Sequence, residues 1–237
     1  MPALTWDETG QRFYETGVDH GVLYIPDATG AYGKGVAWNG LTTVTESPSG
    51  AEANAQYADN IKYLNLFSAE EFGATIEAFT FPDEFMQFDG LANPGAGVAV
   101  GQQSRKTFGL SYRTRLGNDI EGDDFGYRLH LMYGCQASPS ERAYQTINDS
   151  PAAIAFSWAV TTTPVPAGTD LKPTALITVT STVADAAGLK SLEDMLYGGG
   201  TATEAKLPLP EEVIALFPSV GGTVVQQSVE PPDSQPA

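Results

Sequence analysis

The chain has 237 residues, of which 29 are acidic and 12 are basic, so its net charge is −17 and its isoelectric point lies near 4.2. Because proteins that bind nucleic acids rely on Lys and Arg side chains to neutralise phosphates, this charge argues against a general polyanion binder. Hydrophobic residues make up 42% of the chain, which is enough for a packed core, and the single cysteine excludes an internal disulfide framework.

The segments expected to form strands are short, and turn signals separate them. They are rich in β-branched and aromatic residues, the types that favour strands. Their spacing predicts a mainly β fold, an antiparallel sandwich or barrel. In chain order the segments are residues 20–25, 35–46, 61–67, 71–81, 105–115, 126–133, 153–162 and 174–182.

Helices are expected mainly towards the C-terminal end. In AAGLKSLEDMLYG the spacing puts Leu189, Leu192 and Leu196 on one side. Gly198, at the end of that run, is a suitable C-cap. The run LPEEVIALF begins with a proline followed by two acids, which is the first-turn pattern of a helix. A further short helix is expected over residues 82–88.

We expect a single domain over residues 1–222 and a disordered tail over residues 223–237, where SVEPPDSQPA is polar and rich in proline. The start MPALTWDETGQRF lacks the basic and apolar regions of a signal peptide. No apolar run approaches the ~20 residues that cross a bilayer. Synthesis in the cytoplasm, without membrane contact, is therefore expected.

One connecting segment is unusually long. SPSGAEANAQYADN, from Ser47 to Asn60, joins two strand candidates where a hairpin needs only about two to five residues. Loops of such length are more often functional or disordered than idle. Its Tyr57 and Asp59 are candidate residues for contact with a partner.

The acid-rich stretch SAEEFGATIEAFTFPDEF first suggests the paired carboxylates of a hydrolase. Period-two alternation places Glu71, Thr75 and Glu77 on one face and the apolar residues between them on the other. Along one strand, Glu71 and Glu77 lie ~20 Å apart at ~3.3 Å per residue, whereas glycosidase carboxyls are ~5–9.5 Å apart. These acids are therefore expected to charge a surface that faces water or a partner.

Other candidate sites are interpreted as structural. Residues 119–124 hold four acids, but the twelfth position of an EF-hand loop is His130 and not Glu, so a hairpin tip is expected instead of a calcium site. The stretch Gly95–Gly101 follows no strand, so a flexible connector is expected instead of a dinucleotide loop. His130 and Cys135 are expected to be structural residues. We expect no catalytic residue, no cofactor and no metal.

Six longer runs, in this order, span most of residues 35–217. The runs are GVAWNGLTTVTESPSGAE, YADNIKYLNLFSAEEFGATIEAFTFPDEF, GQQSRKTFGLSYRTRLGND, GYRLHLMYG, SPSERAYQTINDSPAAIAFSW and LPLPEEVIALF. With these runs the chain resembles the major tail protein, or tail-tube protein, of long non-contractile-tailed bacteriophages (siphophages). None of the runs is a chemical motif, so the resemblance rests on the six together.

The resemblance implies a β-sandwich-like subunit with a flanking helix and long loops. Six copies are implied to form a ring whose inner sheets make a joint β-barrel, and the rings stack into a virion tail tube assembled in the host. Genome DNA passes through the lumen during ejection without specific binding. A tape-measure protein, a tail terminator and a distal tail protein are the implied partners.

Two roles remain open for the acidic face. Glu71, Thr75 and Glu77 either line the lumen or form salt bridges, within or between subunits, with a basic strand face. That face is expected to carry Arg105, Arg113 and Arg115.

The long segment is the candidate for contact between stacked rings. Its candidate contact residues are Ser47, Glu52, Tyr57 and Asp59.

Two other classes of function are weighed. Another virion component, a capsid decoration or tail-terminator protein, is expected to form a trimer or single ring instead of a filament. A carbohydrate-binding or carbohydrate-hydrolysing β-sandwich is suggested by Trp6, Trp38 and Trp158, although aromatics at strand spacing are more often core. Trp158, in register with Phe156 and Val160, is expected on a core face.

Overall fold

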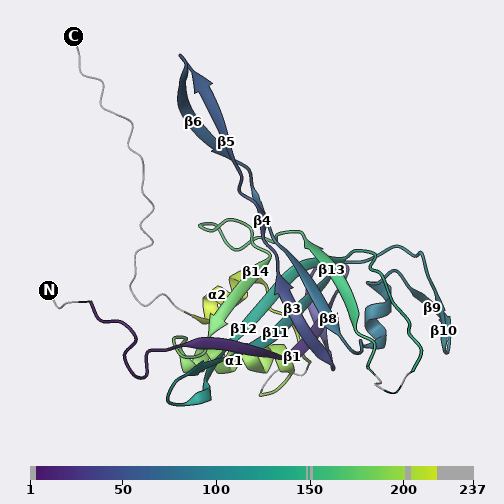
Figure 1. Cartoon of the computed structure of the whole chain (residues 1–237). Coiled ribbons are helices and arrows are strands. Elements are labelled where there is room, and N and C mark those ends of the chain that lie inside the picture. Colours follow the sequence, from purple (N-terminus) through teal and green to yellow (C-terminus); the bar gives the residue numbers. More distant parts are fainter. Residues whose placement is uncertain (1–3, 148, 150–151, 201–203, 218–237) are drawn as a thin grey trace, which may run out of the picture.

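The computed structural model describes residues 4–147, 149, 152–200 and 204–217, so the predicted tail over residues 223–237 lies outside the described residues. Within them the chain is mainly β, as predicted, with two α-helices and one 3-10 helix (Figure 1). The helices are η1 (Asp83–Gln87), α1 (Ala186–Tyr197) and α2 (Pro210–Leu216).

In the described residues, every strand belongs to one of four antiparallel sheets. They are β1 (Tyr14–Pro26), β2 (Tyr32–Ala37), β3 (Leu41–Glu46), β4 (Ser49–Gly50), β5 (Ala53–Ala58), β6 (Ile61–Phe67), β7 (Glu70–Glu71), β8 (Gly73–Ala78), β9 (Ala92–Gly95), β10 (Val98–Val100), β11 (Phe108–Asn118), β12 (Gly122–Ala137), β13 (Phe156–Thr162) and β14 (Leu176–Thr180).

The largest sheet runs in the order β2-β1-β11-β12-β13-β8-β3, with β14 pairing β12 off this path. Strand β12 is 16 residues long and is shared between two groups of strands. Its Arg128–Met132 part pairs with β14, and its Cys135–Ala137 part pairs with β13. The sheet therefore folds over at β12, and β13, β8 and β3 form a second layer.

Gly134 occupies the position on β12 where this change of partner occurs. Its φ of 58° lies in the left-handed region, which glycine adopts without a Cβ penalty. A Cβ at this position would overlap the backbone carbonyl of Thr163, whose amide donates a hydrogen bond of 3.0 Å to the Gly134 carbonyl. The close approach of the two strands therefore requires glycine here.

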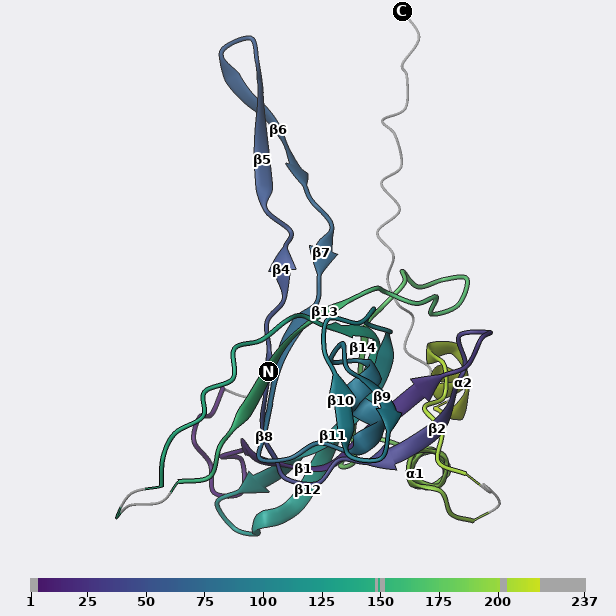
Figure 2. The same ribbon diagram turned by 90° about the vertical axis from the view of Figure 1, so that its right-hand side faces the viewer.

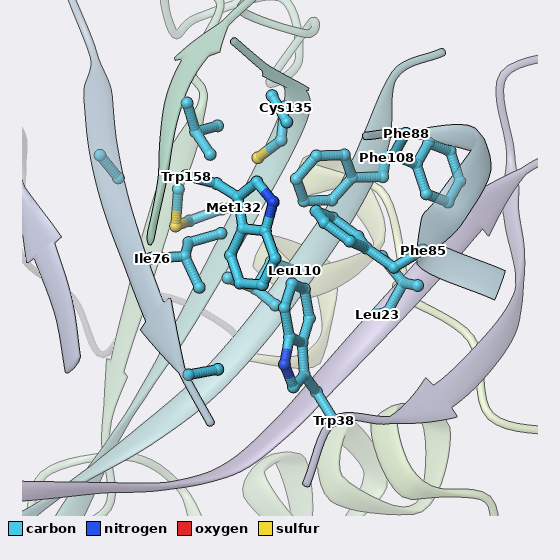
Figure 3. Close-up of a cluster of buried hydrophobic side chains, with 14 of the residues drawn as sticks. Leu23, Trp38, Ile76, Phe85, Phe88, Phe108, Leu110, Met132, Cys135 and Trp158 are labelled. Atoms are coloured by element: carbon cyan, nitrogen blue, oxygen red, sulfur yellow. The ribbon is translucent and has the colours of Figure 1, made fainter. Parts of the chain in front are cut away.

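A cluster of buried aromatic and aliphatic side chains fills the space between the two layers (Figure 3). Trp158 on β13 and Ile76 on β8 face Leu110 on β11 and Met132 on β12. The ring of Phe85, on η1, lies 4.6 Å from that of Trp38 and 5.1 Å from that of Trp158, between centroids. The predicted core positions of Trp158 and Cys135 are confirmed, and burial raises the pKa of the Cys135 thiol.

The helices cover the other face of the first layer. Leu189, Leu192 and Leu196 of α1 are buried, which confirms the predicted apolar side. They belong to a second cluster with Leu129 and Leu131 of β12. Both predicted helices are confirmed, and Gly198 ends α1 with a φ of 74°. The short helix expected over residues 82–88 is η1.

Several predicted elements are wrong in detail, including residues 35–46 and Gly95–Gly101. The stretch 35–46 is not one strand, because Asn39-Gly40 forms a turn, with Gly40 at a φ of 77°, that divides it into β2 and β3. The stretch Gly95–Gly101 is not a flexible connector but part of the β9–β10 hairpin.

The aromatic cluster yields a prediction about stability. Phe85→Ala removes a side chain that is 0% exposed, so it should lower the free energy of unfolding by about 3–5 kcal/mol. Phe79→Ala is the matched control, because its ring is 53% exposed, and it should cost under about 1 kcal/mol. Urea unfolding followed by tryptophan fluorescence measures both. Equal costs for the two variants would contradict the packing described here.

Candidate assembly surfaces

A two-stranded arm projects from the body of the protein (Figures 1 and 2). It consists of the β4–β7 pair near the body and the β5–β6 pair beyond it. At its base the amide of Ser47 donates a hydrogen bond of 2.8 Å to the carbonyl of Gly73. Asp59 and Asn60, with φ of 51° and 63°, form the turn at its tip.

The structure corrects the prediction of a long connecting loop. Residues 47–60 are the outgoing half of the arm, and residues 61–67, assigned to the body from sequence, return along them as β6. Of the four predicted contact residues, Ser47 lies at the base, Glu52 between β4 and β5, Tyr57 on β5 and Asp59 at the tip. Their role in contacts between rings stays a prediction.

The arm exposes large apolar side chains on both of its faces. Tyr57, Tyr63 and Phe67 are 72%, 70% and 69% exposed. Leu64 and Leu66, also exposed, lie opposite Gln56 and Asn54, while Phe67 lies opposite Ala53 on the other face. A two-stranded hairpin is at best marginally stable in water, and a contiguous apolar surface marks an interaction site. The arm is therefore a candidate interaction surface.

The outward side of β3, β8 and β13 is a second candidate surface, which we call the hydroxyl face. On β8 the alternation is as predicted, because Ala74, Ile76 and Ala78 are buried while Thr75 and Glu77 are partly exposed. Thr75 pairs across the strands with Thr45 and Ala159, and Glu77 pairs with Thr43 and Ser157. The hydroxyl face comprises Thr43, Thr45, Thr75, Glu77, Ser157, Ala159 and Thr161.

The hydroxyl face contains no Lys or Arg among these seven described residues. In Figure 2, β8, the central strand of this face, lies on the opposite side of the body from α1 and α2. Glu71 does not belong to the hydroxyl face. That residue pairs with Ser49 in the base of the arm, because the strand breaks at Phe72. The prediction that one strand carries Glu71, Thr75 and Glu77 is therefore wrong for Glu71.

Arg113 and Arg115 share one face of β11, as predicted, but Arg105 lies outside the strand and does not belong to that face. Arg113 binds Asp19 through two hydrogen bonds of 2.7 and 3.0 Å, and Arg115 lies 3.3 Å from the same carboxylate. Arg105 precedes β11 and donates to the backbone carbonyls of Ala137 and Asp89. Within the described chain these arginines therefore pair with Asp19 and Asp89, not with Glu71 or Glu77.

Asp19 holds an irregular part of β1, where the pairing with β11 shifts register on both sides of it. The hydrogen bond from Arg113 is the main reason that the pKa of Asp19 lies far below its usual range, although partial burial opposes it. Asp19 was not identified from the sequence. The alternation of side chains along a strand does not show where its pairing with another strand shifts register.

A second polar network joins the base of the arm to the body. Nδ1 of His130 lies 2.9 Å from Oε1 of Glu46, the last residue of β3, and its Nε2 lies 3.0 Å from Oγ1 of Thr114. The hydroxyl of Tyr112 donates to the same Glu46 oxygen at 2.5 Å. The hydrogen bond with His130 is the main reason that the pKa of Glu46 is lowered, and the bond from Tyr112 lowers it further. Burial of the carboxyl group opposes both effects. The prediction that His130 is a hydrogen-bonded structural residue is confirmed.

The acidic residues 119–124 lie at the tip of the β11–β12 hairpin, as predicted: residues 119–121 form the turn, residues 122–124 begin β12, and Asn118 pairs with Gly122. Asp119 accepts a hydrogen bond from the Gly10 amide, and Asp123 accepts one from the Tyr14 hydroxyl. Over the described parts of the chain, no group of three or more His, Cys, Asp or Glu side chains is arranged to hold a metal ion.

Comparison with protein-family models and with curated protein sequences finds no match for this chain. No helix in the described ranges has both the length and the hydropathy needed to span a membrane. The arm and the hydroxyl face are therefore the main structural observations that bear on function.

The ion pairs of Asp19 predict a pH dependence. A carboxylate whose pKa is lowered by folding stabilises the native state above its unfolded pKa of ~3.9, and this contribution is lost as the pH falls. Asp19→Asn should therefore lower stability at pH 7 and reduce the further loss between about pH 5 and 3.

The control for this prediction is Asp124→Asn on the exposed β11–β12 turn. Urea midpoints measured across this pH range should show the full wild-type slope in Asp124→Asn and a shallower slope in Asp19→Asn. Parallel curves for all three proteins would mean that the Asp19 ion pairs do not stabilise the fold.

Proposed function

We propose that the protein is a structural virion subunit that polymerises as stacked hexameric rings into the tail tube of a long non-contractile phage tail. The observation that carries the proposal is the projecting arm, whose apolar side chains are exposed on both faces. The resemblance of the sequence to major tail proteins supports it. The number of six subunits is what that resemblance implies.

In this assembly the arm contacts the next ring. Its apolar side chains are covered there, which removes the cost of holding them in water at ~25 cal/mol per Å². The base of the arm is tied to the body by Ser47 and, through Glu46, by His130. A contact at the tip is therefore transmitted to the sheet of the subunit.

The hydroxyl face lines the lumen in this proposal. Arm, hydroxyl face and helices lie on three different sides of the body, so the arm can point along the tube while the helices face outward (Figures 1 and 2). A conduit must let DNA pass without retaining it, and a lining of Thr, Ser, Ala and Glu77 offers no cation to phosphates. At physiological salt the Debye length is ~8 Å, so such a lining acts at short range.

Two strands of the subunit have an open edge that is available for contacts between copies. Strand β3 ends the strand order and pairs only with β8, and β14 pairs only with β12. Unpaired edges favour pairing with another chain, and a closed ring is one way to satisfy them. The other implied partners are a tape-measure protein, a tail terminator and a distal tail protein.

Two rival functions are less well supported. A carbohydrate platform needs exposed aromatic rings, but Trp38 and Trp158 are buried in the core, which leaves Trp6 as the exposed tryptophan of the three. A capsid decoration or tail-terminator protein can also be β-rich. Such a protein is expected to form a trimer or a single ring instead of a filament. An arm with exposed apolar side chains on both faces is explained better by contacts between stacked rings.

Removing the apolar surface of the arm tests the contact between rings. The triple variant Tyr57→Ser, Tyr63→Ser, Phe67→Ser should remain folded, because these side chains touch no core, but should give free subunits or single rings instead of long tubes. The matched control is Gln56→Ser, Lys62→Ser, Asn65→Ser, which changes polar residues of the same strands. Sedimentation velocity and negative-stain microscopy distinguish the products. Long tubes formed by the apolar variant would exclude the arm as the contact.

Reversing one charge on the hydroxyl face tests the lining. Glu77→Lys places one cation on β8 of every subunit, so particles with this subunit should assemble but release DNA more slowly, most clearly at low salt. Glu211→Lys makes the same change of charge on the exposed side of α2 and should release DNA at the wild-type rate. Equal release rates for the two variants would refute a lumenal position for Glu77.

A further inference from the structure

Opposite charges occupy the two ends of the β11–β12 hairpin. One end is acidic: residues 119–121 join the two strands and residues 122–124 begin β12, and we call residues 119–124 together the acidic turn. Arg105 lies just before β11 at the other end, beside Ala137, the last residue of β12. Strand β11 has 11 residues, so the two ends are ~36 Å apart at ~3.3 Å per residue.

A pocket of about 550 Å³ lies at the basic end. Two arginines, Arg105 and Arg142, line it and share one carboxylate, that of Asp89, whose side chain is only 6% exposed. The guanidinium of Arg142 also lies over the rings of Phe81 and Phe156. We call this the arginine pocket; its remaining lining residues are Gly90, Leu91, Gln102, Gln103, Pro139 and Ser140.

The arginine pocket carries a net positive charge in a strongly acidic protein. Two guanidinium groups and one carboxylate leave one positive charge, which is only partly screened because both arginine side chains are about three-quarters covered. The side-chain amide of Gln102 adds a neutral hydrogen-bond donor, whereas the side chains of Gln103 and Ser140 already donate to the carbonyls of Gly101 and Ser138. Such a pocket suits a carboxylate.

The acidic turn has the complementary chemistry. The carboxylates of Asp119 and Asp123 accept hydrogen bonds within the chain, whereas the exposed carboxylates of Glu121 and Asp124 have no hydrogen bond or ion pair with the described residues. Beside them, the side chain of Ile120 is 65% exposed. The acidic turn therefore presents two available carboxylates beside an apolar side chain.

We propose that the acidic turn of one copy docks in the arginine pocket of the next copy, so that subunits join head to tail around the ring. The inference rests on the proposed self-assembly and specifies its lateral contact. The two surfaces are different and lie at opposite ends of one hairpin, so the contact is heterologous and each copy offers one of each. A heterologous contact repeats from copy to copy and closes into a ring when the rotation allows.

Cysteine pairing tests the contact directly, because the native Cys135 is fully buried. Glu121→Cys and Gln102→Cys place one thiol on the acidic turn and one at the rim of the pocket, both at exposed positions. An equimolar mixture of the two single variants, oxidised under assembly conditions, should give a cross-linked dimer. Either variant alone should stay monomeric on a non-reducing gel. A dimer from either variant alone at equal yield would overturn the head-to-tail arrangement.

A charge reversal supplies the second measurement. Adding Asp124→Lys to Glu121→Cys should lower the cross-linking yield with Gln102→Cys by tenfold or more, and added salt should lower the yield of the unmodified pair. The control adds Asp170→Lys, an exposed acid of the 162–176 connection, and should leave the yield unchanged.

The outcomes separate this inference from the proposed function. Tubes that assemble without the cross-link overturn the docking contact and leave the tube proposal standing. A specific cross-link in discrete rings that never stack supports the docking contact and contradicts the tube.

Discussion

The proposed assembly depends on one feature of the arm, the exposure of large apolar side chains on both of its faces. Two strands can satisfy each other's backbone hydrogen bonds, but they cannot cover large side chains on both of their faces. Tyr57, Tyr63 and Phe67 are therefore left in water by the chain itself. The body, in contrast, encloses two apolar clusters between its two layers and beneath its helices. The body therefore has its own packed cores, whereas the arm leaves apolar side chains that its own chain does not cover. This combination is expected of a subunit that assembles with further copies.

The body is arranged so that each of its sides is available for a different contact. Because β12 changes partners at Gly134, one continuous sheet supplies both layers of the core. The helices close the outer face of one layer, and the hydroxyl face of the other stays open. Polar networks around Asp19 and His130 fix the irregular course of β1 and the base of the arm. In the proposed tube these sides become the lumen, the exterior and the contacts between copies.

Sequence patterns predicted those features that depend on neighbours along the chain. The alternation over Ala74, Ile76 and Ala78 and the spacing of Leu189, Leu192 and Leu196 each report one face of one element, so both predictions are confirmed. Patterns failed where pairing between distant strands decides the outcome. Whether residues 61–67 join the body or turn back on residues 53–58 is invisible in their composition, since β-rich segments suit either pairing.

The same limit applies to the charges. Arg113 and Arg115 were placed on one strand face from their spacing, but their partner depends on the register between β1 and β11, which brings Asp19 across from them. Arg105 was grouped with them although the strand begins only at Phe108. The exposed apolar residues of the arm were visible in the sequence, yet exposure is a property of the fold and not of the pattern.

A cryo-electron microscopy map of the purified protein after polymerisation tests the central claim most directly. The account predicts stacked rings around an open channel, with β3, β8 and β13 turning Thr75 and Glu77 towards the bore, α1 and α2 on the outside, and each arm packed against the neighbouring ring. A map in which the arm packs back on its own subunit, or in which the hydroxyl face lies on the exterior, would contradict it.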